Sequence, residues 1–176
     1  MKTFGGQAIF LDRSDINTDE IIPAKYLSMI TKTALRPHLL EDLLLDGKPF
    51  DAHSQEMQAA KVVVSRANFG CGSSREHAVW AFEVNGINLV IAESFARIFR
   101  QNMFNCGILA IALDKEHIDA LFALAPKGAV TVTVDLAAEK LKAEAGGVYE
   151  CDFQLNDFDR ELVGAGGWLS YADERY

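Results

Sequence analysis

A glycine-rich stretch in the middle of the chain, NFGCGSSREHA at positions 68–78, constrains the fold more than any other part of the sequence. It follows the β-branched run Val62–Val64, which predicts a buried strand, and it precedes the apolar run His77–Val84, which is long enough only for a covered helix. The sequence therefore predicts a strand, a tight turn and a helix start. Gly70 and Gly72 allow positive φ angles or a close approach of the backbone to a ligand.

The polar side chains of this turn favour an anion site. The first free N–H groups of the helix and the helix dipole point into the space beside the turn. Ser73, Ser74 and Arg75 follow the glycines, and a guanidinium can bind a carboxylate through two parallel hydrogen bonds. The alternative is structural: Ser73 and Glu76 have the spacing of a capping box, which leaves Ser74, Arg75 and the two glycines unexplained.

The size and charge of the chain limit its class. Its 176 residues, 49% of them hydrophobic, can bury a core and predict a single domain over residues 1–176. A formal net charge of −8 argues against a nucleic-acid surface, so an anionic ligand must be met by local cations. No apolar run approaches the roughly 18 residues of a membrane span, and the first residues show no apolar signal region. We therefore expect a cytoplasmic protein that binds neither nucleic acid nor membrane.

The rest of the chain alternates strands and helices up to Pro126. Strands are predicted over 4–11, 88–92 and 108–113, which implies parallel crossovers with the glycine-rich turn at the carboxyl end of a strand. Ser94 is a plausible N-cap for the helix after the second of these strands. That helix has an inner face of Phe95, Ile98, Phe99 and Met103 and an outer face of Arg97, Arg100 and Gln101. Arg97 and Arg100 are expected to meet solvent, and contact with substrate or a partner is the alternative.

The later part of the chain changes pattern. Residues 130–134 alternate with period two, and two further short strands around Gly146 and Gly147 indicate an antiparallel hairpin. A last short helix is predicted over 157–164, followed by an acidic tail from about residue 168. Residues 46–58 predict a mobile surface loop. The fold class is thus α/β, a mostly parallel central sheet with additional antiparallel strands.

Three cysteines, Cys71, Cys106 and Cys151, are far apart and odd in number. Neither a disulfide framework nor a CxxC metal site is indicated by that spacing.

Three motifs resemble the swivelling domain of the aconitase family. The first is residues 69–78, the second is residues 94–99 with Asn102 and residues 107–109, and the third is the Thr-Asp-containing loop 17–24. They follow the family's order from about Phe4 to Ile111. A chain this short resembles the separate small subunit of the family's isopropylmalate dehydratases, and the resemblance implies a three-layer β/β/α domain.

The resemblance also implies an activity and partners. The activity is the interconversion of 2-isopropylmalate and 3-isopropylmalate by dehydration and rehydration, in leucine biosynthesis. The partner is a large subunit that carries a [4Fe–4S] cluster, while this chain binds no metal or cofactor of its own. The substrate is a small di- or tricarboxylic acid. Two alternatives stay open: the small subunit of a related dehydratase of the homoaconitate, dimethylmalate or citramalate type, and a non-catalytic carboxylate-binding module.

The motif positions imply roles for individual residues. Ser73 matches the family's catalytic serine, a base in its alkoxide form, while Ser74 would hydrogen-bond the substrate or Ser73 and Arg75 would bind a substrate carboxylate. His77 is expected to be structural or to lie near the site. The resemblance places the loop residues Asn17, Thr18 and Asp19 near the active site. Plain helix capping explains these three residues equally well.

Two further segments match substrate-selecting parts of the family. Tyr26, Leu27, Ser28 and Met29 fall where related dehydratases select the substrate side chain, and they suit an uncharged alkyl group because a buried carboxylate needs a partner. Simple packing of Tyr26, Leu27 and Met29 is the alternative. Arg36 resembles an arginine of aconitase that binds substrate carboxylate, although an exposed arginine ahead of a helix explains it as well.

Overall fold

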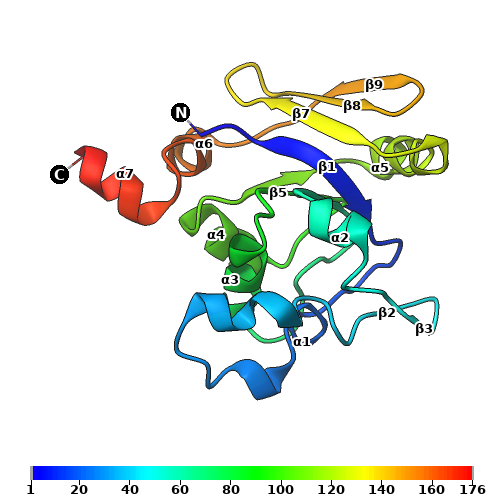
Figure 1. Ribbon diagram of the computed structural model, residues 1–176. Helices are drawn as coiled ribbons and strands as arrows, with labels where there is room; N and C mark the ends of the chain where they lie inside the picture. The colour runs from blue at the N-terminus through cyan, green and yellow to red at the C-terminus, as the bar shows by residue number, and fades with distance from the viewer. Residues whose placement is uncertain (1, 176) are drawn as a thin grey trace.

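The computed structural model describes residues 2–175, and its centre is a seven-stranded mixed sheet (Figure 1). The strand order is β6-β5-β4-β1-β7-β8-β9. Strands β1, β4, β5 and β6 run parallel, whereas β7 pairs antiparallel with β1 and with β8, and β8 with β9. The bounds are β1 Gly5–Phe10, β4 Val62–Val64, β5 Leu89–Ala92, β6 Leu109–Ala112, β7 Thr131–Asp135, β8 Lys140–Glu144 and β9 Val148–Asp152.

The helices complete a layered arrangement. Figure 1 shows the antiparallel strands above β1 and β5, with α3 and α4 below, and α5 contacts both β4 and β9. The bounds are α1 Thr18–Ile21, α2 Gln55–Ala59, α3 Glu76–Val84, α4 Arg97–Asn105, α5 Lys115–Phe122, α6 Asp157–Gly164 and α7 Trp168–Arg175. Shorter elements are η1 Ala24–Tyr26, η2 Lys32–His38, η3 Ala125–Lys127 and the hairpin β2 Leu44–Leu45 with β3 Lys48–Pro49.

The burial of each strand explains the pattern of apolar residues in the parallel and antiparallel halves of the sheet. All residues of β4 and β5 are fully buried, because both faces of a parallel strand are covered by other elements. The exposed and buried positions of β8 instead alternate, as in a strand with one face to solvent. The predicted α/β class, with a mostly parallel sheet and added antiparallel strands, is confirmed. In residues 2–175, no helix combines the length and apolar character of a membrane span.

Two segments differ from the prediction. Residues 46–58 are not simply a mobile loop, because they contain β3 and most of α2, whose N-terminus is capped by Ser54 through a 3.1 Å bond from the Met57 amide. The chain after residue 167 is not a released tail, since α7 forms there and Trp168 stacks on Tyr171.

Helix α4 also begins and packs differently from the prediction. Ser94 does not cap it: the Ser94 hydroxyl accepts a 2.8 Å bond from the Asn68 amide, and the helix starts three residues later at Arg97. Ile98 is 56% exposed rather than buried. Arg100 does not project freely into solvent, because its guanidinium donates to the Ala110 carbonyl at 2.8 Å.

Candidate active site

The loops that follow β1, β4 and β5 meet at the carboxyl-terminal edge of the parallel strands. In open α/β sheets this edge is where ligands bind. Isolated bridges pair Asn17 with Cys71 and Phe69 with Phe95, so the loop after β4 is joined to both neighbours. The glycine-rich turn therefore lies between two other loops, as its position after a buried strand predicts.

We define the central loop as residues 65–75. Its two glycines, Gly70 and Gly72, are required for different structural reasons. Gly70 has φ +81°, and a Cβ at this position would lie 2.2 Å from the ring of Phe99. Gly72 has φ +93°, but the nearest atom to a Cβ there would be Asn17 Cβ at 3.5 Å. Gly70 is thus required by packing as well as conformation, whereas Gly72 is required by its positive φ.

Thr18 fixes the backbone of the central loop. Its amide donates to the Cys71 carbonyl at 2.9 Å, and its hydroxyl donates to the Ser73 carbonyl at 2.9 Å. The Thr18 residue is only 1% exposed, so these bonds are shielded from water. The loop position of Thr18 therefore has a structural explanation: it holds Ser73 in place.

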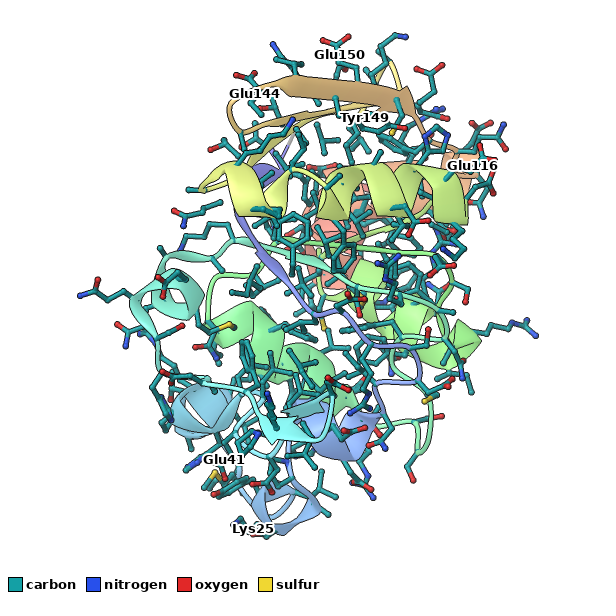
Figure 2. All side chains as sticks on the ribbon, turned by 90° about the vertical axis from the view of Figure 1, so that its right-hand side faces the viewer. Lys25, Glu41, Glu116, Glu144, Tyr149 and Glu150 are labelled. Carbon is teal, nitrogen blue, oxygen red and sulfur yellow. The ribbon has the colours of Figure 1, made fainter. Side chains whose placement is uncertain are left out.

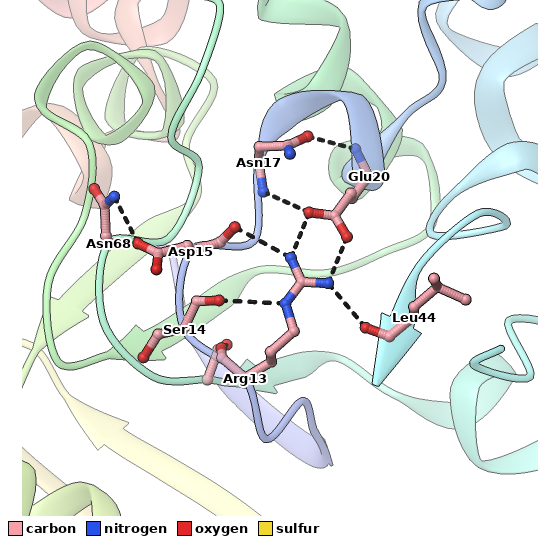
Figure 3. Close-up of polar contacts among 8 residues, drawn as sticks. Arg13, Ser14, Asp15, Asn17, Glu20, Leu44 and Asn68 are labelled. Carbon is pink, nitrogen blue, oxygen red and sulfur yellow. Dashed lines mark hydrogen bonds and ion pairs between the residues drawn. The ribbon is translucent and has the colours of Figure 1, made fainter. Parts of the chain in front are cut away.

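The entry loop, residues 11–17, is held by a charged network (Figure 3). Asn17 caps α1 by accepting from the Glu20 amide at 3.0 Å, and the Glu20 carboxylate completes a capping box with the Asn17 amide. Hydrogen bonds from Arg13 lower the pKa of Glu20 despite its partial burial. The Arg13 guanidinium also donates to the backbone carbonyls of Ser14, Asp15 and Leu44. The capping explanation for Asn17 is confirmed.

The capping explanation for Ser73 is wrong. Helix α3 starts at Glu76, and Arg75, in an extended conformation at φ −122° and ψ 117°, occupies the N-cap position without a side-chain cap. The hydroxyls of Ser73 and Ser74 form no hydrogen bond with any residue in the described range 2–175, and both residues are exposed. Their hydroxyls are therefore available to a ligand.

Arg75 is the cation beside these hydroxyls. Its guanidinium forms an ion pair with Asp19 of α1, so the central loop and the entry side are also joined through side chains. The Asp19 side chain is 59% exposed and that of Arg75 22% exposed. Because an exposed pair is weak, a carboxylate ligand can compete with Asp19 for the guanidinium.

A cavity of about 640 Å³ runs along the central loop. It lies between the loop and the first turns of α4, and it is lined by Gly70, Gly72, Ser74, Ala96, Arg97, Ile98, Phe99, Gln101 and Asn102. Arg97, which the sequence places in solvent, therefore contributes a second cation to the site. Asn102, which the sequence places in the second motif, contributes an amide.

Other predicted site residues lie outside this cavity. Tyr26 stacks on His38 with ring centroids 3.8 Å apart, and its hydroxyl bonds to Glu41. Leu27 and Met29 are partly buried, while Ser28 is exposed. The next residue, Ile30, is 97% exposed. The predicted substrate-selecting segment ends at Met29, although Ile30 directly after it extends its apolar character.

Arg36 and His77 make contacts outside the central loop. The Arg36 carbonyl accepts a 3.1 Å bond from Asn85, which follows α3 at the helix end opposite Arg75. A separate cavity of about 420 Å³ is lined by Thr33, Arg36, Pro37, Leu39, Ala52, His53, Met57, Gln58 and Asn85. The His77 ring lies 4.6 Å from that of Trp80, a packing contact in the first turn of α3.

The three cysteines lie on different elements. Cys71 is in the central loop, Cys106 ends α4 and Cys151 is in β9. Burial raises the pKa of the Cys106 thiol to about 11, which disfavours the thiolate that metals bind. Within residues 2–175, no three His, Cys, Asp or Glu side chains gather as a metal site would require. The donor set of this chain does not fit an iron–sulfur cluster.

Comparison with known proteins places these features in context. The family model of the aconitase C-terminal domain matches residues 1–116. The small subunit of 3-isopropylmalate dehydratase from Halalkalibacterium halodurans is 35% identical over 173 residues, which cover 96% of this chain and 88% of the relative. The protein of the same name from Azorhizobium caulinodans is 39% identical over 167 residues, which cover 92% of this chain and 82% of that relative.

A solved structure is similar over nearly the whole chain. The crystal structure of 3-isopropylmalate dehydratase from Methanocaldococcus jannaschii superimposes with a TM-score of 0.75 at 31% sequence identity. The match covers 99% of this chain and 95% of that one. The overall fold and the two chain lengths therefore agree.

Proposed function

This chain belongs to the family of 3-isopropylmalate dehydratase small subunits, built on the aconitase C-terminal domain, and from that premise we propose how its residues take part in the reaction. The small subunit acts in isopropylmalate isomerisation, a step of leucine biosynthesis. In the proposed reaction, water leaves 2-isopropylmalate and returns to the neighbouring carbon to give 3-isopropylmalate. The proton that is removed lies next to a carboxylate, where its acidity is low, so a well-placed base is needed.

Ser73 is the proposed base, and the observation that carries this role is its free, exposed hydroxyl on an anchored backbone. The hydroxyl serves no helix cap, while Thr18 holds the Ser73 carbonyl at 2.9 Å. A serine hydroxyl is a weak acid, so its alkoxide must be stabilised by nearby positive charge. Arg75 and the first amide groups of α3 are the groups in this chain that supply such charge.

Arg75, in the central loop, is the proposed binding group for a substrate carboxylate, and Arg97, which lines the cavity beside that loop, is the proposed second cation. The chain as a whole has a net charge of −8, so a dicarboxylate is attracted by these local cations rather than by the overall field. Ser74, which also lines the cavity, is placed to hydrogen-bond the substrate. Tyr26–Met29 and Ile30 are proposed to meet the alkyl part of the substrate. Arg36, which lines the second cavity, is the alternative to Arg75 as the carboxylate-binding group.

The [4Fe–4S] cluster is proposed to lie on a large subunit. Such a cluster, when bound with an open iron position, supplies Lewis-acid assistance to the departing hydroxyl. This placement is supported by the cysteines of this chain, which lie on separate elements. A cytoplasmic location stays a prediction of the sequence.

Reconstitution tests this assignment. The chain is mixed with a purified, cluster-loaded large subunit under anaerobic conditions and assayed with 2-isopropylmalate, homoaconitate, dimethylmalate and citramalate. We expect isomerisation of 2-isopropylmalate by the mixture and by neither subunit alone. Preferred turnover of another acid would assign a related dehydratase. Tight binding of dicarboxylates by this chain, without turnover in the mixture, would indicate a binding module.

A further inference from the structure

Glu41 joins two segments that are distant in the chain. Its Oε1 accepts from the Tyr26 hydroxyl, and its Oε2 lies 2.9 Å from His38 Nδ1. The rings of Tyr26 and His38 stack, with centroids 3.8 Å apart and an interplanar angle of 15°. Lys25 Nζ lies 4.0 Å from the same carboxylate. Figure 2 labels Lys25 and Glu41 together at the end of the molecule opposite β9.

These contacts close a loop around residues 27–37. We call Lys25, Tyr26, His38 and Glu41 the clasp. Burial raises the pKa of Glu41, but the bonds from Tyr26 and His38 and nearby positive charge outweigh it, so the net pKa is lowered and the carboxylate stays charged. Both carboxylate oxygens of Glu41 therefore take part in contacts that join the two ends of the loop 27–37. Glu41 serves no helix cap, so this is its evident role.

The enclosed loop has further contacts on both sides of its tip. Leu35 is buried and Lys32 pairs with Glu83 at 3.1 Å, which fixes the far side. The Met29 amide donates to the Tyr26 carbonyl at 3.1 Å, which ties the near side directly to the clasp. Ile30 follows and is 97% exposed. Residues 27–30 are thus tied to Tyr26, whose side chain is held by Glu41 and by stacking on His38.

We infer that Glu41 is a positioning residue for substrate selection: through Tyr26 it sets where residues 27–30 meet the alkyl group of the substrate. This inference rests on the proposed function. A carboxylate that touches no substrate atom can act in this way because a pocket distinguishes alkyl groups only when its wall is held in place. Loosening the wall reduces binding of a large alkyl group more than binding of a small one.

The test compares two substrates that differ only in the alkyl group. 2-Isopropylmalate carries an isopropyl group where citramalate carries a methyl group. Glu41→Ala, reconstituted with the large subunit, is expected to reduce the kcat/KM ratio of isopropylmalate to citramalate about tenfold, mainly through KM for isopropylmalate. Glu41→Gln retains an acceptor for Tyr26 and should restore most of the ratio. Asp42→Ala, a change at the exposed neighbouring residue, is the matched control.

Proteolysis gives a readout that needs no catalysis. Trypsin cleaves after Lys32, inside the enclosed loop, and Glu41→Ala should speed this cleavage several-fold relative to wild type and Asp42→Ala. An active wild-type pair whose substrate ratio does not change in Glu41→Ala overturns the role of Glu41 alone, as does an unchanged cleavage rate. Equal losses of kcat/KM for isopropylmalate and citramalate also overturn the role of Glu41, since they indicate general destabilisation. A wild-type pair inactive on isopropylmalate overturns the proposed function itself.

Discussion

At the scale of single residues, the site depends on which groups are already engaged and which are free. Ser73 has the spacing of a helix cap, yet its backbone carbonyl is bonded to Thr18 and the chain stays extended through Arg75, so α3 starts too late for Ser73 to cap it. The sequence could not predict this, because the bond joins residues that are 55 positions apart. The positive φ of Gly70 and Gly72, in contrast, follows from local sequence.

Gly70→Ala tests the packing of the central loop. Its Cβ would meet the buried ring of Phe99 at 2.2 Å and would also occupy a positive φ, so we expect a loss of about 2–4 kcal/mol in the free energy of unfolding. Gly72→Ala is the matched control, since it has a similar φ but open space, and should cost about 1 kcal/mol. Urea denaturation measures both. Equal losses would show that the Phe99 contact is unimportant.

Arg75→Lys tests the carboxylate-binding role. Lysine keeps the charge but loses the two parallel bonds, so KM of the reconstituted enzyme should rise about tenfold. Unfolding stability should change by less than about 1 kcal/mol, because the partner Asp19 is 59% exposed. Arg36→Lys provides the comparison, and a small effect is expected there because Arg36 lies at the other end of α3. A larger effect at Arg36 would move the carboxylate site to the second cavity.

At the scale of elements, strands and helices with strong local patterns follow the prediction. The strands at 62–64 and 89–92 are continuous apolar runs, and the helix over 157–164 has the predicted bounds. Helix α4 does not begin as predicted, because Ser94 bonds to the Asn68 amide of the central loop instead of capping the helix. Where a polar side chain has two possible partners, local and distant, sequence alone does not decide between them.

Glu20→Gln tests the network at the start of α1. The pKa of Glu20 is lowered in the folded protein by its bonds from Arg13, so the charged form stabilises the fold above the unfolded pKa of 4.5 and this contribution is lost as pH falls through the lower folded pKa. At pH 7 the variant should lose about 1 kcal/mol of stability, and the difference from wild type should vanish towards pH 2.

The control for that series is Glu56→Gln. Glu56 is likewise an acid in the first turn of a helix, α2, but it is exposed and does not pair with an arginine in the described structure. Glu56→Gln should lower the free energy of unfolding by only a few tenths of a kcal/mol, the effect of losing a negative charge at a helix N-terminus. A loss at Glu20 that is no larger than at Glu56, or that persists at pH 2, would rule out the ion pair as the cause.

At the scale of the whole molecule, the order of strands brings the three motifs together. Parallel pairing of β1 with β4 and of β4 with β5 places the entry loop, the central loop and the start of α4 at one edge. The alternating strand–helix pattern predicts parallel crossovers, but not that β1 lies between β4 and β7. That placement comes from non-local pairing. The resulting edge presents Ser73, Ser74 and Arg75 from the central loop beside Arg97 from the start of α4.

The most direct measurement is the turnover of 2-isopropylmalate by Ser73→Ala paired with the cluster-loaded large subunit. If Ser73 is the base, kcat should fall about 10²–10⁴-fold, while KM and unfolding stability stay close to wild type because the hydroxyl caps no helix. A kcat equal to that of wild type, in a variant that still folds and binds the large subunit, would contradict the assignment of Ser73 as the base.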